Sequence, residues 1–219
     1  MKKYFFLLFS ILFFSNLFAQ ECPAFWNDIL SFKKKDSTQF PPKNAILFIG
    51  SSSFTNWKDV QDYFPGYTII NRGFGGSSLK DVIRYSYDIL LPYQPKQVII
   101  YCGENDLASS ANAQAADVVQ RFKTLYGIIR QNLPNAVVHF VSLKPSPSRK
   151  HLFSKMKEAN RNIKALLQID KKAGFINVYD AMLDETGNPK KEIFLGDQLH
   201  MNAKGYAIWK KIILPYLIK

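Results

Sequence analysis

The chain is poor in the residues that bind metal ions or form disulfides. It has two cysteines, Cys22 and Cys102, and three histidines among 219 residues. So few and scattered ligands do not make a zinc site, and the sequence predicts neither a metal site nor another cofactor. A disulfide between the two cysteines is compatible with export. Cys102 lies in an apolar run, however, where burial as a small hydrophobic side chain is the more frequent outcome.

The N-terminus lacks the long apolar segment that a membrane span needs. A basic start, Met1-Lys2-Lys3, precedes an apolar run over residues 4–18 and then Ala19-Gln20. This layout is typical of a secretory signal peptide over residues 1–20, cleaved after Ala19 or Gln20, and its apolar part is short for a span. We therefore expect a secreted or periplasmic protein with no stable membrane span after signal removal. A retained N-terminal anchor is the alternative.

Acidic residues are scarce relative to basic ones. The chain has 17 acidic and 29 basic residues, a formal net charge of +12. Such a balance can attract nucleic acid, anionic lipid or acidic polysaccharide. The basic residues are spread along the chain, which is typical of solvated faces, and an exported protein rarely meets nucleic acid. We predict no nucleic-acid partner and only a weak preference for an acidic substrate or surface.

The remaining sequence alternates between short apolar runs and amphipathic stretches. Helices are predicted where apolar residues recur every three or four positions, at residues 117–133, 153–172 and 203–218. Strands are predicted where short runs are continuously apolar, at residues 45–49, 67–70, 97–102, 136–141 and 175–179. Alternation of this kind indicates an α/β fold with a parallel sheet covered on both faces. Residues 45–219 form one domain in this interpretation, and residues 21–44 form a lead-in segment packed on it.

The first predicted strand runs into Gly50-Ser51-Ser52-Ser53. A serine at a strand-to-helix turn can act as a nucleophile when a neighbouring base takes its proton, but serines are also common helix N-caps. The chain has no Gly-x-Ser-x-Gly sequence, which excludes the nucleophile elbow of the α/β-hydrolases.

Two further motifs follow the second and third predicted strands. The second strand leads into a glycine-rich segment that contains Gly76, where the backbone can approach a ligand closely. A plain turn is the alternative, and the absence of a following Lys-Ser or Lys-Thr argues against a nucleotide P-loop. The third strand leads into Gly103-Glu104-Asn105-Asp106. The amide of Asn105 could stabilise an oxyanion or close an Asx-turn.

Asp197 and His200 precede the last predicted helix. A histidine that acts as a general base needs a carboxylate to orient it, and Asp197 lies three residues away. The other histidines have simpler interpretations. His139 lies inside the fourth predicted strand and is expected in the core or the sheet, and no acidic residue is spaced to orient His151.

These four motifs stand in the order of the four blocks of the SGNH (GDSL-type) hydrolases, which the chain resembles over about residues 45–215. The likeness is closest to small bacterial esterases and to the catalytic subunits of platelet-activating-factor acetylhydrolase. The resemblance implies a flavodoxin-like three-layer α/β/α sandwich with a central five-stranded parallel sheet. By position it implies the catalytic residues Ser52, Asp197 and His200 and an oxyanion hole of Ser52, Gly76 and Asn105.

Two positions depart from the family pattern. Ser51 stands where an aspartate usually precedes the nucleophile, which leaves open which of three serines attacks. Ser77 stands where small members often have an aspartate. With export, the resemblance favours a serine esterase that removes O-acetyl groups from carbohydrates. The alternatives are a lysophospholipase or broad acyl-ester or thioester hydrolase, and a non-catalytic glycan-binding module. The oligomeric state is left open.

Overall fold

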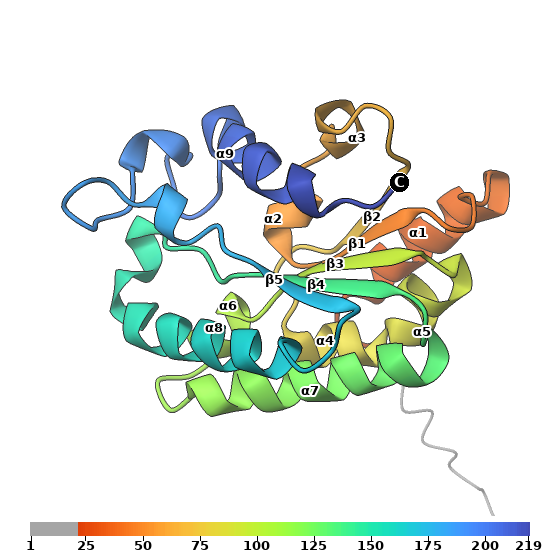
Figure 1. Ribbon diagram of the computed structural model, residues 1–219, viewed down its shortest axis with the longest axis horizontal. Helices are drawn as coiled ribbons and strands as arrows, with labels where there is room; N and C mark the ends of the chain where they lie inside the picture. The colour runs from red at the N-terminus through yellow and green to blue at the C-terminus, as the bar shows by residue number, and fades with distance from the viewer. Residues whose placement is uncertain (1–21) are drawn as a thin grey trace, which may run out of the picture.

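A five-stranded parallel sheet forms the centre of the protein. The computed structural model describes residues 22–219, so the predicted signal peptide lies outside the described residues. The strand order is β2-β1-β3-β4-β5 (Figure 1). The strands are β1 (Ile46–Gly50), β2 (Ile69–Gly73), β3 (Gln97–Tyr101), β4 (Val137–Val141) and β5 (Ala173–Ile176). The predicted α/β architecture with five parallel strands is confirmed.

Burial decreases from the middle of the sheet to its edges. All five residues of β1 and all five of β3 are buried, because helices cover both faces of a parallel sheet. The edge strands β2 and β5 are only partly buried. The continuous apolar runs of the central strands are therefore the part of the sheet that the sequence predicts most directly.

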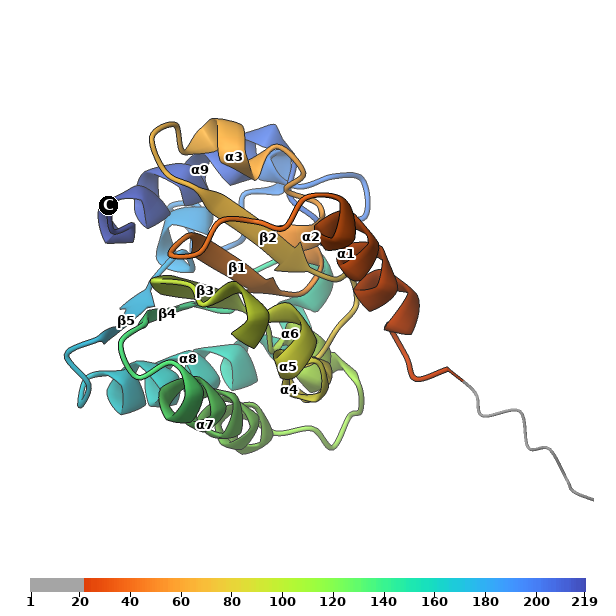
Figure 2. The same cartoon turned by 90° about the vertical axis from the view of Figure 1, so that its right-hand side faces the viewer.

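Helices pack on both faces of the sheet and give three layers (Figures 1 and 2). One face carries α4 (Leu79–Arg84), α5 (Ser86–Ile89), α7 (Ala115–Asn132) and α8 (Phe153–Leu167), and α1 (Trp26–Thr38) adds to this core. The other face carries α2 (Ser52–Thr55), α3 (Val60–Tyr63) and α9 (Ala203–Ile213). Side chains alternate along each strand, so Leu47 belongs to the first core and Phe48 to the second.

The second core is rich in aromatic rings. Phe54 contacts Phe48 at a ring-centroid distance of 4.9 Å, and Trp57 stacks on Tyr206 at 4.8 Å. Tyr206 lies on α9, and Trp57 follows α2. Aromatic pairs add about 0.5–1.5 kcal/mol beyond their buried area. The C-terminal helix is thus packed against the segment that follows β1.

Two strands differ from their predicted ranges. The strand predicted at 67–70 is instead Ile69–Gly73, because Asn71, Arg72 and Gly73 continue the parallel pairing with β1 as far as Gly50. The strand predicted at 175–179 is instead Ala173–Ile176. It ends early because the N–H groups of Val178 and Tyr179 donate to the Ser142 hydroxyl, at 3.0 and 3.1 Å.

The segment predicted as a lead-in holds a helix that the sequence analysis missed, α1. The predicted helices 117–133, 153–172 and 203–218 are present with shifted ends, as α7, α8 and α9. Short 3-10 helices complete the chain: η1 (Leu91–Tyr93), η2 (Pro147–Leu152), η3 (Asp180–Met182), η4 (Lys191–Ile193) and η5 (Leu214–Tyr216). Among residues 22–219, no helix combines the length and apolarity needed to cross a membrane.

Cys102 and His139 have the environments expected from the sequence. Cys102 is a buried free thiol and Cys22 an exposed one. His139 lies in β4 with Nδ1 3.1 Å from the Gln97 amide nitrogen. Burial lowers the pKa of His139 to about 4, so it is a neutral sheet residue at physiological pH.

Candidate active site

The first motif is shaped by the turn that follows β1. Gly50 has φ +140°, and a Cβ at this position would lie 1.9 Å from the Tyr101 carbonyl oxygen, so only glycine fits. The next N–H, of Ser51, donates to that same carbonyl at 3.0 Å. The chain then leaves the carboxyl edge of the sheet and starts α2 at Ser52.

The three serines of this turn differ in exposure. Ser51 and Ser53 are buried, with 3% and 2% of their surface exposed, whereas Ser52 is half-buried. A nucleophile must reach a substrate, so this difference favours Ser52 over its neighbours.

The glycine-rich segment after β2 lies beside Ser52. A Cβ on Gly75 would be 4.0 Å from Ser52 Cβ. The segment is tied to the first turn, because Phe74 N–H and the Ser77 hydroxyl both donate to the Gly50 carbonyl, at 2.9 and 3.2 Å. Ser77 therefore has a structural contact of its own at the position where small family members often carry an aspartate.

Two backbone N–H groups at this edge are free to donate. Gly76 adopts a left-handed conformation with φ +83°. Within the described part of the chain, neither Gly76 N–H nor Ser52 N–H donates to a protein acceptor. An oxyanion hole consists of such preorganised donors, and both of these belong to residues that the sequence analysis selected.

Asn105 lies on the short helix α6 (Glu104–Ala108), which follows β3. Its Nδ2 donates to the Ser77 carbonyl at 3.0 Å. The third motif is therefore joined to the second, because the Asn105 amide is hydrogen-bonded to Ser77, the residue that follows Gly76. Asp106, next to Asn105, accepts from Leu79 N–H at 2.9 Å and from Arg121 at 2.7 Å, which fixes this segment against α4 and α7.

Asp197 and His200 form a hydrogen-bonded pair. His200 Nδ1 lies 2.6 Å from Asp197 Oδ2, and Asp197 Oδ1 accepts from the N–H groups of Leu199 and His200 at 2.9 Å each. The His200 hydrogen bond, followed by the two backbone donors, lowers the pKa of Asp197 to about 2. Because Nδ1 is engaged, Nε2 is the ring nitrogen left for proton transfer.

The C-terminal helix connects this pair to the first motif. Asn202 caps α9 by accepting from Lys204 N–H at 2.9 Å. The Tyr206 hydroxyl, one turn further, donates to the Ser53 carbonyl at 2.9 Å. The buried Tyr206–Ser53 hydrogen bond therefore connects α9, which follows the His200 loop, to α2, which begins at Ser52.

Two cationic residues near Asn105 were not selected from the sequence. Lys144 lies in a Pro-containing loop after β4, and its Nζ is buried 3.1 Å from Glu104 Oε2. Arg149 of η2 reaches Asn105 Oδ1 at 3.4 Å. The sequence alone shows that Glu104 is next to Asn105, but it does not show that Lys144 and Arg149 lie near this segment. His151, also in η2, is exposed.

A hollow of about 670 Å³ lies between η2 and the segment that leads into η4. It is lined by residues that include Lys150, Lys190 and Lys191, and none of the five candidate site residues lines it. The Ser148 N–H of η2 donates to the Gln198 carbonyl at 3.2 Å, and this bond connects η2 to the Asp197–His200 loop.

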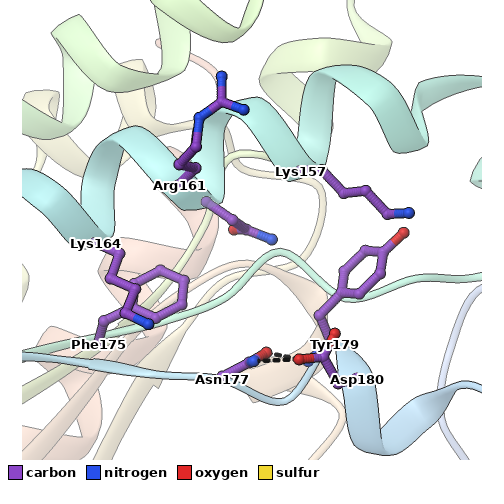
Figure 3. Close-up of a pocket in the computed structure, with 8 residues that line it drawn as sticks. Lys157, Arg161, Lys164, Phe175, Asn177, Tyr179 and Asp180 are labelled. Carbon is purple, nitrogen blue, oxygen red and sulfur yellow. Dashed lines mark hydrogen bonds between the residues drawn. The ribbon is translucent and has the colours of Figure 1, made fainter.

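A second, smaller pocket lies on the α8 side of the molecule (Figure 3). It is formed by α8 and the segment after β5, and Lys157 extends toward Tyr179 across it. None of the five candidate site residues lines this pocket. Ligand binding there would be separate from chemistry at Ser52.

The five-stranded parallel sheet with helices on both faces matches the fold of the SGNH/GDSL hydrolases. A profile of the GDSL-like lipase/acylhydrolase family matches residues 41–208. The chain belongs to this family and is a carboxylic ester hydrolase. No match was found among curated proteins.

Solved structures share the fold at low sequence identity. A Streptococcus pneumoniae structure described in terms of platelet activating factor is 20% identical, with a TM-score of 0.76, over 88% of this chain and 92% of that one. A GDSL-like lipase from Bacteroides thetaiotaomicron is 19% identical, with a TM-score of 0.74, over 86% and 96%. A catalytic mutant of Axe2, an acetylxylan esterase from Geobacillus stearothermophilus, is 14% identical, with a TM-score of 0.62, over 80% and 94%.

Proposed function

We propose that the protein is an exported serine esterase that removes O-acetyl groups from carbohydrates, with Ser52 as nucleophile. The observation that carries the mechanism is the Asp197–His200 pair, joined at 2.6 Å on a loop that α9 ties to the helix of Ser52. A serine hydroxyl becomes a useful nucleophile only with such an oriented base.

The proposed reaction has two acyl-transfer steps. Ser52 Oγ attacks the ester carbonyl carbon while His200 Nε2 takes the hydroxyl proton, and Asp197 stabilises the imidazolium. The N–H groups of Ser52 and Gly76 and the Asn105 amide bind the oxyanion. Collapse breaks the ester C–O bond, and His200 returns the proton to the leaving alcohol. Water, deprotonated by His200, then attacks the acyl-enzyme and releases acetate and free Ser52.

The substrate proposal rests on three observations. The N-terminus has the layout of a signal peptide, so the enzyme would meet polymers outside the cytoplasm. The hollow next to η2, which Ser148 connects to the His200 loop, is lined mostly by polar and charged side chains, which suits a hydroxyl-rich ligand better than a long acyl chain. The structural relative Axe2 is an acetylxylan esterase.

A chain-length series of p-nitrophenyl esters tests this proposal when it is combined with acetate release from acetylated xylan, pectin and peptidoglycan. We expect highest activity on the two-carbon ester and acetate release from at least one of the polymers, with Ser52→Ala as the inactive control. A preference for eight-carbon esters without glycan deacetylation would contradict the carbohydrate assignment and indicate a lysophospholipase or broad acyl-ester hydrolase.

A further inference from the structure

The amide of Asn105 is held from both ends. Its Nδ2 donates one of two N–H groups to the Ser77 carbonyl at 3.0 Å, which leaves the second N–H for an oxyanion. Its Oδ1 faces the guanidinium of Arg149, with Nη2 at 3.4 Å. A flipped amide would place Oδ1 against the Ser77 carbonyl and Nδ2 against a cation, so both contacts favour the same orientation.

Arg149 is itself fixed relative to the site. Its Nη1 lies 3.5 Å from the Glu104 carbonyl oxygen, and its backbone N–H donates to the Ser146 carbonyl at 3.0 Å. The preceding residue, Ser148, donates its N–H to Gln198 on the His200 loop at 3.2 Å. Arg149 therefore contacts the Glu104–Asn105 segment, while its neighbour Ser148 contacts the loop that carries His200, the proposed general base.

The charge of Arg149 is not neutralised by an ion pair. Among residues 22–219, no carboxylate lies within salt-bridge distance of its guanidinium, and the carboxylate of adjacent Glu104 is engaged by Lys144. The two side-chain contacts of 3.4 and 3.5 Å are longer than ordinary N–H···O bonds. Arg149 consequently acts on the Asn105 amide through its charge as well as its geometry, since a charge influences a neighbouring dipole beyond contact distance.

We propose that Arg149 is a positioning residue of the oxyanion hole, which holds the Asn105 amide with Nδ2 toward the reacting carbonyl and polarises it. This rests on the proposed function of Asn105. The competing role for a cation at this place is direct binding of an acidic group on the substrate. The two roles differ in kinetics, because a positioning residue affects turnover of a neutral ester and a substrate ligand affects KM of an acidic one.

The test measures kcat and KM for p-nitrophenyl acetate, a neutral substrate, in Arg149→Met, Arg149→Lys and the control Arg84→Met. Loss of one oxyanion donor costs on the order of 10²–10³ in turnover, so weaker positioning in Arg149→Met should cost roughly tenfold or more, with KM changed by less than about twofold. Arg149→Lys should lie between Arg149→Met and the parent. Arg84→Met, which removes an exposed cation at the end of α4 and lies outside the proposed site, should match the parent.

A double-variant cycle separates action through Asn105 from an independent role. If Arg149 acts through Asn105, adding Arg149→Met to Asn105→Ala lowers kcat little further. Three results would each overturn the proposal. They are losses of kcat that multiply in the double variant, an unchanged kcat in Arg149→Met, and a rise confined to the KM of an acidic acetylated glycan. Should Arg149→Met unfold at a lower temperature, Arg149→Lys supports the same cycle. Full activity in Asn105→Ala would instead refute the proposed oxyanion hole.

Discussion

Lys144 Nζ lies 3.1 Å from Glu104 Oε2, and their side chains are only 2% and 6% exposed. The pair is completed by the Tyr101 hydroxyl, which donates to Glu104, and by Lys144 N–H, which reaches Glu104 Oε1 at 3.2 Å. Glu104 directly precedes Asn105 in the chain. The ion pair therefore fixes one end of the segment that presents the Asn105 amide, and Asp106 fixes the other end.

Removing one partner of this pair should destabilise the protein strongly. Lys144→Met leaves the Glu104 carboxylate buried without its cation, and broken buried pairs cost about 3–5 kcal/mol. We expect a loss of that size in the free energy of unfolding from urea titrations. The matched control is Lys33→Met, since Lys33 and Asp88 form an exposed pair at 2.6 Å and such pairs contribute at most about 1 kcal/mol.

The double variant Glu104→Leu/Lys144→Met distinguishes a charge effect from a packing effect. Replacement of both charges by apolar groups removes the unpaired buried charge, so the double variant should be more stable than either single variant. A double variant less stable than both would show that the pair contributes mainly through packing. The kcat of the double variant should still be lower than that of the parent, because the segment that carries Asn105 loses the Glu104–Lys144 ion pair.

The choice of nucleophile can be tested among adjacent serines. Ser52→Ala should lower kcat for p-nitrophenyl acetate by about 10⁴-fold or more, since loss of a nucleophile removes most of the catalysis. Ser51→Ala is the matched control: Ser51 is buried, and its backbone rather than its hydroxyl accepts from Phe54 and Thr55 N–H. Retained activity in Ser52→Ala with loss in Ser51→Ala would reverse the assignment.

The sequence can bring the candidate site residues together because parallel strands end at one edge of the sheet. Motifs that directly follow β1, β2 and β3 must meet there, whatever the details of the loops. Asp197 and His200 are close in the chain, so their pairing needs only a tight turn. None of these inferences requires knowledge of long-range side-chain contacts.

Lys144 and Arg149 could not be predicted in the same way. Each is about 40 residues from its partner in the Glu104-Asn105 segment, and isolated lysine and arginine residues are most often exposed. The helix α1 was missed for a related reason. Its stability comes from contacts such as Asp36 with Arg72, because its own sequence, with three consecutive lysines, has little apolar periodicity.

The proposed export predicts a defined mature N-terminus. Residues 1–20 have the layout of a signal peptide, so the protein recovered from the periplasm or the medium should start at Gln20 or Glu21. N-terminal sequencing or mass spectrometry of the exported protein measures this directly. A chain that begins at Met1 and stays with the membrane fraction would instead indicate a retained N-terminal anchor.

Titration of Asp197 should not contribute to the pH dependence of activity. The pKa of Asp197 is lowered to about 2 by His200 and two backbone donors, below its ordinary value of about 3.9. Its depressed pKa favours the folded state above pH 3.9, and this contribution is lost as the pH falls through about 2. Asp197 is therefore ionised wherever the enzyme is assayed, and kcat/KM measured between about pH 5 and pH 9 should show no step that belongs to this carboxyl.

Asp197→Asn tests the role of that carboxylate. The asparagine retains the shape of the side chain but cannot stabilise an imidazolium, and it can donate to Nδ1, which favours the wrong tautomer of His200. We expect kcat to fall by up to about 10⁴-fold, whereas the melting temperature should fall only modestly, because the Asp197 side chain is 47% exposed. Asp62→Asn, which alters an exposed carboxylate of α3, should leave kcat unchanged. Equal, small losses in both variants would show that Asp197 only shapes the loop.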